Sequence, residues 1–201
     1  MTFGSFNNAA KVTPEVVRVW SAILVHVPSA RLILKSRAFG DAPTRERYLR
    51  QFAGNGVDPG RVDLLPPMDV IDHHLQAYDR IDIGLDPFPY NGTTTTCEAL
   101  WMGVPVVTLA GRHHVARVGA SLLTQCGLAE FIAADEAGYI EAAVALAGDT
   151  GRLTTLRRGM RERMERSALS DHRGFAAAVE AAYRDMWRLW LGGDRSAAAE
   201  C

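Results

Sequence analysis

Short apolar segments alternate with longer stretches of helical periodicity along nearly the whole chain. The apolar segments lack a polar alternation, which is typical of parallel strands that are buried on both faces. Candidate strands lie at 3–6, 31–35, 62–65, 81–85, 104–109 and 130–132, and candidate helices at 14–28, 43–53, 73–78, 93–102, 115–126, 136–147, 151–167 and 171–191. This order predicts an α/β fold, a Rossmann-like doubly wound parallel sheet.

The size, charge and hydropathy of the chain exclude several classes of protein. Its 201 residues fit one domain, which we expect to span 1–192 and to be followed by a frayed tail at 193–201. A net charge of −1 gives no reason to expect nucleic acid as a partner. No apolar run approaches the roughly 20 residues of a membrane span, and the start lacks a secretory signal. We therefore expect a soluble cytoplasmic domain with no membrane partner.

The predicted topology itself indicates where a ligand would bind. In an open parallel sheet, ligands lie outside the carboxyl ends of the strands. The loops that follow candidate strands there are 7–11, 66–74, 86–96 and 110–117. These four loops are the places where polar side chains are most informative.

A run of four threonines opens the helix after the fourth candidate strand. It follows the turn signal Asn91-Gly92 and occupies 93–96. Free N–H groups at a helix start, aligned with the helix dipole, bind anions, and threonine hydroxyls add donors. The alternative is that one threonine is only an N-cap. Four threonines at the carboxyl end of a strand favour phosphate binding, and the candidate residues are Thr93, Thr94 and Thr95.

Two charged residues lie on or next to these loops. Lys11 is one of only 2 lysines, against 20 arginines, and its ammonium could neutralise a diphosphate. A lone lysine is, however, more often a solvated surface residue. Glu98, in the first turns of the threonine-led helix, could accept hydrogen bonds from ribose hydroxyls or could simply complement the helix dipole. From the residues alone, these alternatives stay open.

The histidine and cysteine pattern does not indicate a metal site. The pairs His73-His74 and His113-His114 lack a third ligand at suitable spacing, and the three cysteines form no CxxC. One of these imidazoles could instead stack on, or hydrogen-bond to, a ligand base. The glycine-rich dinucleotide and P-loop fingerprints are missing, as is the GxSxG nucleophile elbow.

Several dense motifs resemble a known enzyme family. They are FNNAAKVTP at 6–14, LDPFPYNG at 85–92 continuing through EALWMGVPVV at 98–107, RVGASLL at 117–123 and YRDMW at 183–187. Together they resemble the carboxyl-terminal catalytic lobe of O-linked N-acetylglucosamine transferases and of their bacterial and plant SPINDLY-like relatives, which form glycosyltransferase family 41. The resemblance covers about residues 3–190.

The resemblance implies an enzyme of the GT-B fold, with two Rossmann-like lobes and a UDP-sugar donor, UDP-N-acetylglucosamine (UDP-GlcNAc), held mainly by the second lobe. It further implies inverting transfer to a protein Ser or Thr hydroxyl, without a metal or another cofactor.

Site residues also follow from the resemblance. Lys11 matches the lysine that stabilises the departing diphosphate, and Asn8 matches a side chain at a phosphate. The remaining matches are His74 at the uridine, Thr94 and Thr95 at the diphosphate and Glu98 at the ribose. Thr93, Ala77 and Ala116 depart from residues that relatives often carry, which leaves the contacts of Thr93 and the preferred sugar open.

The chain contains no counterpart of the family's amino-terminal lobe or of its helical repeats. Because a GT-B active site lies between two lobes, we expect this chain alone to be inactive. The alternative is a truncated or degenerate domain that acts as a nucleotide-binding or interaction module. A sugar-nucleotide epimerase is a weaker alternative, since such enzymes also need two lobes.

Overall fold

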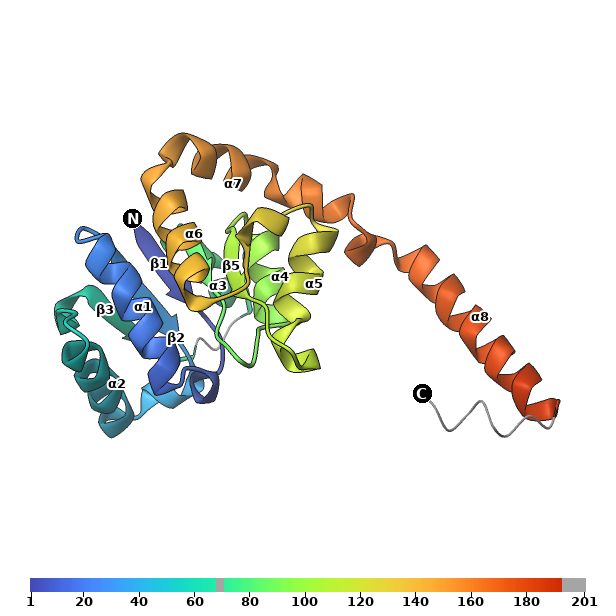
Figure 1. The fold of residues 1–201 in the computed structure, drawn as a ribbon, viewed down its shortest axis with the longest axis horizontal. Coiled ribbons are helices and arrows are strands. Elements are labelled where there is room, and N and C mark those ends of the chain that lie inside the picture. The colour runs from blue at the N-terminus through green and yellow to red at the C-terminus, as the bar shows by residue number, and fades with distance from the viewer. Residues whose placement is uncertain (68–70, 193–201) are drawn as a thin grey trace.

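The computed structural model describes residues 1–67 and 71–192, with the side chains of 71–73 excepted. Its six strands form one sheet in the order β3-β2-β1-β4-β5-β6, and every neighbouring pair is parallel (Figure 1). The strands are β1 Thr2–Ser5, β2 Arg31–Lys35, β3 Val62–Leu65, β4 Ile83–Leu85, β5 Val106–Leu109 and β6 Ile132–Ala133. The predicted doubly wound parallel sheet is confirmed.

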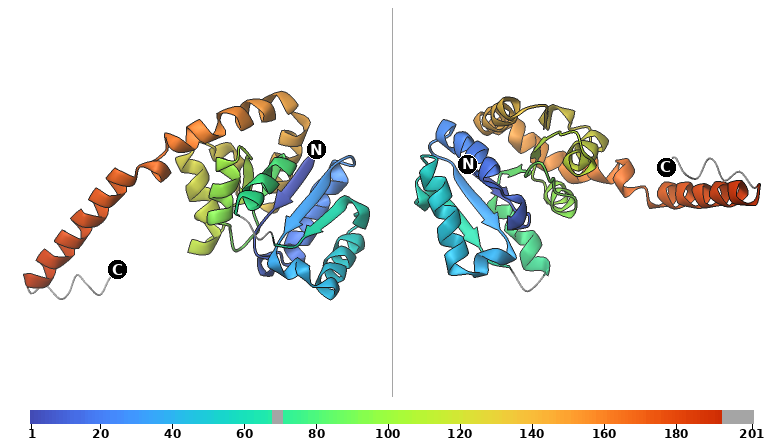
Figure 2. Two further views of the ribbon diagram at one scale, coloured as in Figure 1. Left: turned by 180° about the vertical axis from the view of Figure 1, so that it is seen from behind. Right: turned by 60° about the horizontal axis from the view of Figure 1, so that its bottom comes forward.

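Helices cover both faces of this sheet. α1 packs against α2 and α6 on one face, whereas α4 packs against α5 and α7, and the view from behind brings α3 and α4 to the front (Figure 2). The helices are α1 Pro14–His26, α2 Ala42–Gly54, α3 Ile71–Gln76, α4 Thr94–Trp101, α5 Val118–Gln125, α6 Glu136–Gly148, α7 Thr150–Glu165 and α8 His172–Leu191. Two layers of helices therefore enclose the strands, as a parallel sheet requires.

The chain reverses its direction of travel across the sheet between β1 and β4. Phe3 and Gly4 of β1 pair with Ile83 and Gly84 of β4. A Cβ added at Gly4 would collide with the side chain of Ile81, and one at Gly84 would lie 2.9 Å from Cγ2 of Val106. Glycine at these two positions thus lets the central strands pack closely at the topological switch point, where such sheets bind ligands.

The core is mainly apolar, and a chain of buried hydrogen bonds runs through it. Trp20 of α1 and Tyr139 of α6 are both fully buried, and the Trp20 indole N–H donates to the Tyr139 hydroxyl over 3.1 Å. The Tyr139 hydroxyl in turn donates to the backbone carbonyl of Asp86 over 3.0 Å. This chain of hydrogen bonds ties both helices to the end of β4.

The last helix leaves the globular part of the molecule. α8 projects away from the sheet in every view and buries none of its residues (Figures 1 and 2). Its exposed large apolar side chains are Phe175, Tyr183, Met186, Trp187, Leu189, Trp190 and Leu191. Among the described residues, no helix combines the length and apolar character that crossing a bilayer requires. The tail expected at 193–201 lies outside the described residues, and the division at 192 stays a prediction.

Several element boundaries differ from the expectation by up to three residues, and before three elements a short 3₁₀ turn intervenes, one of them Ala129–Phe131 before β6. The fourth strand begins at Ile83 rather than 81, after the turn Ala77–Arg80. The helix expected from 115 begins at Val118, because the turn His114–Ala116 and the non-helical backbone of Arg117 precede it. The turn before α5 follows β5 at the carboxyl edge of the sheet, where the candidate site lies, whereas the turn before β4 lies at the opposite edge.

Candidate functional site

The candidate residues gather at the carboxyl ends of β1 and β4. The loop after β1 carries Asn7, Asn8 and Lys11, and the loop after β4 leads through Asn91 to the start of α4. The two loops are in direct contact, because the Lys11 ammonium donates to the Asn91 carbonyl over 2.8 Å. The switch point and the sequence candidates therefore coincide.

Lys11 is a partly buried residue with fixed contacts. It ends the 3₁₀ turn Ala9–Lys11, and its Nζ lies 4.1 Å from the centre of the Tyr90 ring, in addition to its bond to Asn91. Burial lowers the pKa of the Lys11 ammonium, and the nearby Asp86 opposes that shift. The alternative of a freely solvated surface lysine is wrong, because the ammonium is held against the loop that opens α4.

Asp86 holds this loop through two hydrogen bonds. Sequence reasoning did not name it as a site residue. One carboxylate oxygen accepts from the Gly92 N–H over 2.6 Å, and the other accepts from the Thr108 hydroxyl over 2.7 Å. Burial raises the pKa of Asp86 to about 7, and Lys11 is among the groups that lower it. A usable signal was present, because Asp86 follows the fourth candidate strand directly.

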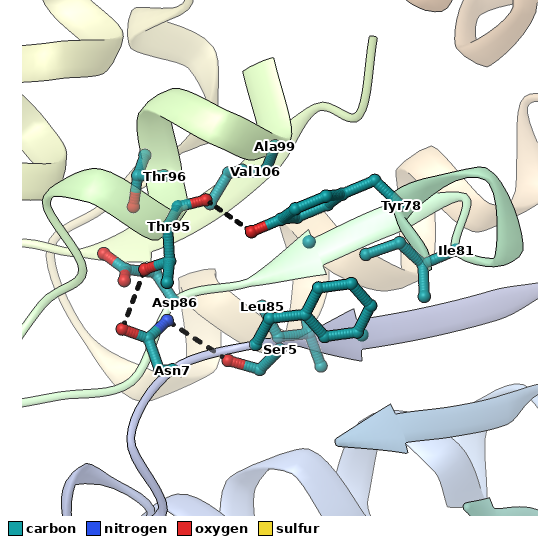
Figure 3. Close-up of a pocket in the computed structure, with 13 residues that line it drawn as sticks. Ser5, Asn7, Tyr78, Ile81, Leu85, Asp86, Thr95, Thr96, Ala99 and Val106 are labelled. Carbon is teal, nitrogen blue, oxygen red and sulfur yellow. Dashed lines mark hydrogen bonds between the residues drawn. The ribbon is translucent and has the colours of Figure 1, made fainter. Parts of the chain in front are cut away.

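The threonine run divides into different roles. Thr93 is the N-cap residue, but its side chain makes no capping hydrogen bond, and Thr94 begins α4 with an exposed side chain. The Thr95 hydroxyl donates to the side-chain oxygen of Asn7 over 3.0 Å, as Figure 3 shows. The backbone N–H groups of the first turn have no partner within the helix. Thr93 and Thr94 thus lie at an exposed helix start, whereas Thr95 joins the two loops.

Asn7, rather than Asn8, links the end of β1 to the start of α4. Its carboxamide donates to the Ser5 hydroxyl over 3.3 Å while it accepts from Thr95 (Figure 3). Asn8 is exposed, and its side-chain oxygen accepts from the Ala10 N–H over 3.0 Å, which caps the turn that carries Lys11. Sequence reasoning named Asn8 and missed Asn7; the predicted phosphate contact of Asn8 stays a prediction.

Glu98 belongs to a compact polar cluster. Its Oε2 accepts from the Tyr78 hydroxyl over 2.9 Å and lies 2.9 Å from Nε2 of His74. The Nδ1 of His74 contacts the ammonium of Lys35, which ends β2 and is only 4% exposed. The structure thus brings His74 and Glu98 together as expected, and it adds Lys35 and Tyr78, which sequence reasoning missed.

The second histidine pair expected from the sequence stands apart from this cluster. His113 and His114 are exposed and lie beside the 3₁₀ turn that precedes α5. The side chain of His73 lies outside the described residues. Within 1–67 and 71–192, no three His, Cys, Asp or Glu side chains gather closely enough to hold a metal ion.

Two hollows border the site. A cavity of about 20 Å³, large enough for about one water, lies beneath Asn7, Tyr78 and Thr95 (Figure 3). A wider groove of about 360 Å³ lies beyond the loop after β4, between Phe88 and Asp135. A nucleotide does not fit the first, and none of the residues expected to bind the ligand lines the second, so the candidate site is the open edge above the cavity.

Comparison with known proteins assigns the chain to a family. The model of glycosyl transferase family 41 matches residues 1–179. The chain belongs to glycosyltransferase family 41. It is 48% identical, over 98% of its length, to a protein of Oryza sativa subsp. japonica named probable UDP-N-acetylglucosamine--peptide N-acetylglucosaminyltransferase SPINDLY. The SPINDLY protein of Arabidopsis thaliana is 46% identical over 96% of this chain. In both cases the chain spans about a fifth of the relative's length: 21%.

Solved structures agree with the family 41 assignment. A lysine-to-methionine mutant of the Thermobaculum terrenum O-GlcNAc transferase superimposes with a TM-score of 0.88 at 43% identity, over 93% of this chain and 36% of that one. A sucrose-phosphate synthase from Thermosynechococcus elongatus shares the fold at 18% identity, with a TM-score of 0.62, over 93% of this chain and 45% of the synthase. The expected fold, a Rossmann-like lobe of the GT-B type, and the expected glycosyltransferase family are confirmed.

Proposed function

We propose that this family 41 chain is the UDP-sugar-binding lobe of an inverting, metal-independent protein O-glycosyltransferase, with UDP-GlcNAc as donor. The observation that carries the proposal is the contact of Lys11 with the loop that opens α4. That contact places a cation beside a helix N-terminus at the switch point, a combination suited to a diphosphate. Relatives at 46–48% identity bear names that specify this donor.

Lys11 and the start of α4 form the diphosphate end of the proposed site. The ammonium supplies a full positive charge, and the exposed start of α4, with Thr94 and Thr93, supplies N–H and hydroxyl donors. Burial makes the charge more effective, because the local dielectric is lower than that of water. Asn8 borders this end on the turn that carries Lys11.

In the proposed reaction, the oxygen of an acceptor Ser or Thr hydroxyl attacks the anomeric carbon of the sugar. The new C–O bond forms as the bond between that carbon and the diphosphate oxygen breaks, and UDP leaves with the electron pair. The hydroxyl proton passes to a base outside this lobe. Lys11 stabilises the negative charge on the departing diphosphate, and this electrostatic role needs no metal ion.

Glu98 and His74 form the nucleoside end. A carboxylate accepts hydrogen bonds from both hydroxyls of a ribose, and Glu98 lies on the same helix whose N-terminus faces the diphosphate end. His74, from α3, lies against Glu98 and supplies a flat ring beside the proposed uridine position. The resemblance assigns Thr95 to the diphosphate, but here its hydroxyl donates to the side-chain oxygen of Asn7.

The other lobe of the enzyme would cover the open edge of this site. The exposed apolar face of α8, including Phe175, Tyr183 and Trp187, is a surface that such a partner lobe could bury. The proposed acceptor is a Ser or Thr of a protein, recruited by helical repeats. A cytoplasmic location and inactivity of this lobe alone remain part of the proposal.

Isothermal titration with UDP tests the proposal directly. The wild-type chain should bind UDP, and Lys11→Met should weaken binding by about tenfold to a hundredfold, the range for losing one hydrogen bond to a charged group. Arg50→Ala is the matched control, because Arg50 is an exposed cation on α2 with only an exposed partner, Glu46. Absence of UDP binding by the folded wild type would overturn the proposal.

A second measurement addresses the alternative of a binding module. Hydrolysis of UDP-GlcNAc, or transfer to a peptide, is assayed for this chain alone and after adding the amino-terminal part of a relative. We expect turnover only in the complemented sample. Robust turnover by the chain alone would contradict the inactivity of the single lobe, and UDP binding without turnover in either sample would favour the binding module.

A further inference from the structure

Lys35 is one of the chain's two lysines, and it lies inside the molecule rather than on its surface. It ends β2, next to β1 in the sheet, and its Nζ lies 4.5 Å from the centre of the Phe6 ring. The ammonium contacts Nδ1 of His74 and also donates to the His74 carbonyl over 3.3 Å. A lysine in this position has a specific partner, the imidazole of His74.

The hydrogen-bonding capacities of these groups fix the direction of each bond. A charged ammonium has three donors and no acceptor, so Nδ1 of His74 must accept from Lys35. A neutral imidazole that accepts at Nδ1 carries its proton on Nε2. Nε2 of His74 therefore donates to Oε2 of Glu98, to which the Tyr78 hydroxyl also donates.

This relay leaves one oxygen of Glu98 available. Both described hydrogen bonds to the carboxylate of Glu98 end on Oε2, one from His74 and one from Tyr78. Oε1 has no partner among the described residues. With Oε2 held at two points, the carboxylate has a fixed orientation, and Oε1 is the atom that can accept from a ligand hydroxyl.

We propose that Lys35 is a positioning residue of the nucleotide site: its ammonium holds His74 in the Nε2–H tautomer, and His74 then holds Glu98 for the ribose hydroxyls. This inference rests on the proposed function, because it assigns Lys35 a role at the nucleoside end of the UDP site. Lys35 itself acts through His74 and need not touch the ligand.

The charges around Lys35 determine how the relay responds to pH. Burial lowers the pKa of Lys35 to about 8, and the carboxylate of Glu98 opposes that shift. The other titratable groups in the cluster are His74 and Tyr78, and burial raises the pKa of Tyr78. Below pH 8 the ammonium is charged and can only donate to Nδ1 of His74, whereas above it the neutral amine has a lone pair and no longer requires Nδ1 to accept.

Two readouts test the role of Lys35, and the first is the tautomer of His74. Nitrogen-15 NMR of histidine-labelled protein, with His74 assigned through His74→Gln, reports which ring nitrogen carries the proton. At pH 6.5 the wild type should show a protonated Nε2 and an unprotonated Nδ1. Lys35→Met, which keeps an unbranched apolar stem of similar length, should show a proton on Nδ1. A protonated Nδ1 in the wild type would overturn the inference.

The second readout is the ratio of UDP dissociation constants for Lys35→Met and the wild type. The ratio should be about ten at pH 6.5 and should fall towards one at pH 9, where wild-type Lys35 is also neutral. Lys11 is present in both proteins, so its own titration cancels in the ratio. Lys35→Arg, which still donates and stays charged, should keep the wild-type tautomer and bind UDP at both pH values. A ratio that does not change with pH would indicate a merely structural lysine and would overturn the inference.

Failure of the inference and failure of the proposed function give different results. Absence of UDP binding by the wild type rejects the nucleotide site itself. UDP binding by the wild type, with an unchanged tautomer in Lys35→Met, rejects only the role of Lys35. Should Lys35→Met not fold, judged by circular dichroism, the ratio of UDP dissociation constants for the wild type and Lys35→Arg decides instead: it should be about one at pH 6.5 and should rise by pH 9, where only the wild-type side chain is neutral, and a ratio that stays constant would overturn the inference.

Discussion

The carboxylate of Asp86 accepts a hydrogen bond from the backbone N–H of Gly92 over 2.6 Å, and Asp86 is only 1% exposed. The bond closes the loop between β4 and α4, and it holds the turn whose Asn91 carbonyl receives Lys11. A buried acid thus sets the shape of the loop that we assign to diphosphate binding.

Asp86→Asn should change how stability depends on pH. The pKa of Asp86 is raised by burial from 3.8 to about 7, so between these values the folded state holds a proton that the unfolded state has lost. This proton stabilises the fold at low pH, and its contribution decreases as the pH rises from 4 to 7, by up to about 1.4 kcal/mol per unit. The excess free energy of unfolding of the wild type over Asp86→Asn, from urea titrations, should therefore fall between pH 4.5 and 7.5.

Asp58→Asn is the matched control for that experiment. Asp58 accepts from the N–H of Gly60 over 2.9 Å in a similar local turn, but it is exposed. Its replacement should leave the pH dependence of stability as it is in the wild type. A difference between wild type and Asp86→Asn that is constant from pH 4.5 to 7.5 would contradict the prediction.

Gly92→Ala should weaken UDP binding without unfolding the protein. An added Cβ would lie 2.6 Å from the Thr95 hydroxyl, 2.8 Å from that of Thr96 and 3.0 Å from the Asn7 carboxamide oxygen, so the start of α4 must shift. We expect a loss of about tenfold or more in UDP affinity by calorimetry, with circular dichroism unchanged. Gly159→Ala, whose Cβ meets open space on α7, should bind UDP as the wild type does. Equal affinity of the two variants would refute the assignment of this turn to the ligand.

Tyr139→Phe should destabilise the fold by about 1–3 kcal/mol. The change removes the hydroxyl that accepts from Trp20 and donates to the carbonyl of Asp86, so a buried donor and acceptor lose their partner. The free energy of unfolding in urea measures the effect. Tyr183→Phe, at an exposed tyrosine of α8, should have no measurable effect. Similar stability of both variants would show that the buried hydroxyl contributes little.

Polar replacements on α8 should leave the stability of this chain nearly unchanged. Phe175 is 72% exposed and Trp187 is 61% exposed, so Phe175→Ser with Trp187→Ser removes almost no buried area. The expected change in the free energy of unfolding is within about 0.5 kcal/mol. Leu24→Ala, in the core, should instead lose about 2–5 kcal/mol. A comparable loss in the α8 double variant would indicate that this face packs against the lobe in solution.

The sheet could be predicted from the sequence because the spacing of apolar residues along a strand or helix follows which of its side chains are buried. All six strands and eight helices lie within three residues of their expected bounds, and 3₁₀ turns account for the later starts at Ile83, Val118 and Ile132. Such turns carry no periodic signal, since they depend on a few backbone hydrogen bonds such as that from the N–H of Ile81 to the carbonyl of Tyr78.

The site was predicted less completely. Lys11, on the loop after β1, and Glu98, on α4, were candidates because of their charge and the strand-end rule, and the family resemblance then suggested their roles. Lys35 and Tyr78 were missed because their function depends on which strands lie side by side, and the sequence does not state that order. Asp86 and Asn7 were missed for a related reason, as both act by supporting neighbours rather than by an unusual local pattern.

The switch point between β1 and β4 has a consequence for how the site forms. Lys11 and Asn91 are separated by 80 positions, and they meet because β1 pairs with β4 at Phe3 and Ile83. The two strands that come between them in the sequence, β2 and β3, lie on the other side of β1, so the chain must cross the sheet to bring the two loops together. The proposed diphosphate site therefore exists only where both halves of the sheet are assembled, and a fragment ending before β4 would hold the cation without the loop that receives it.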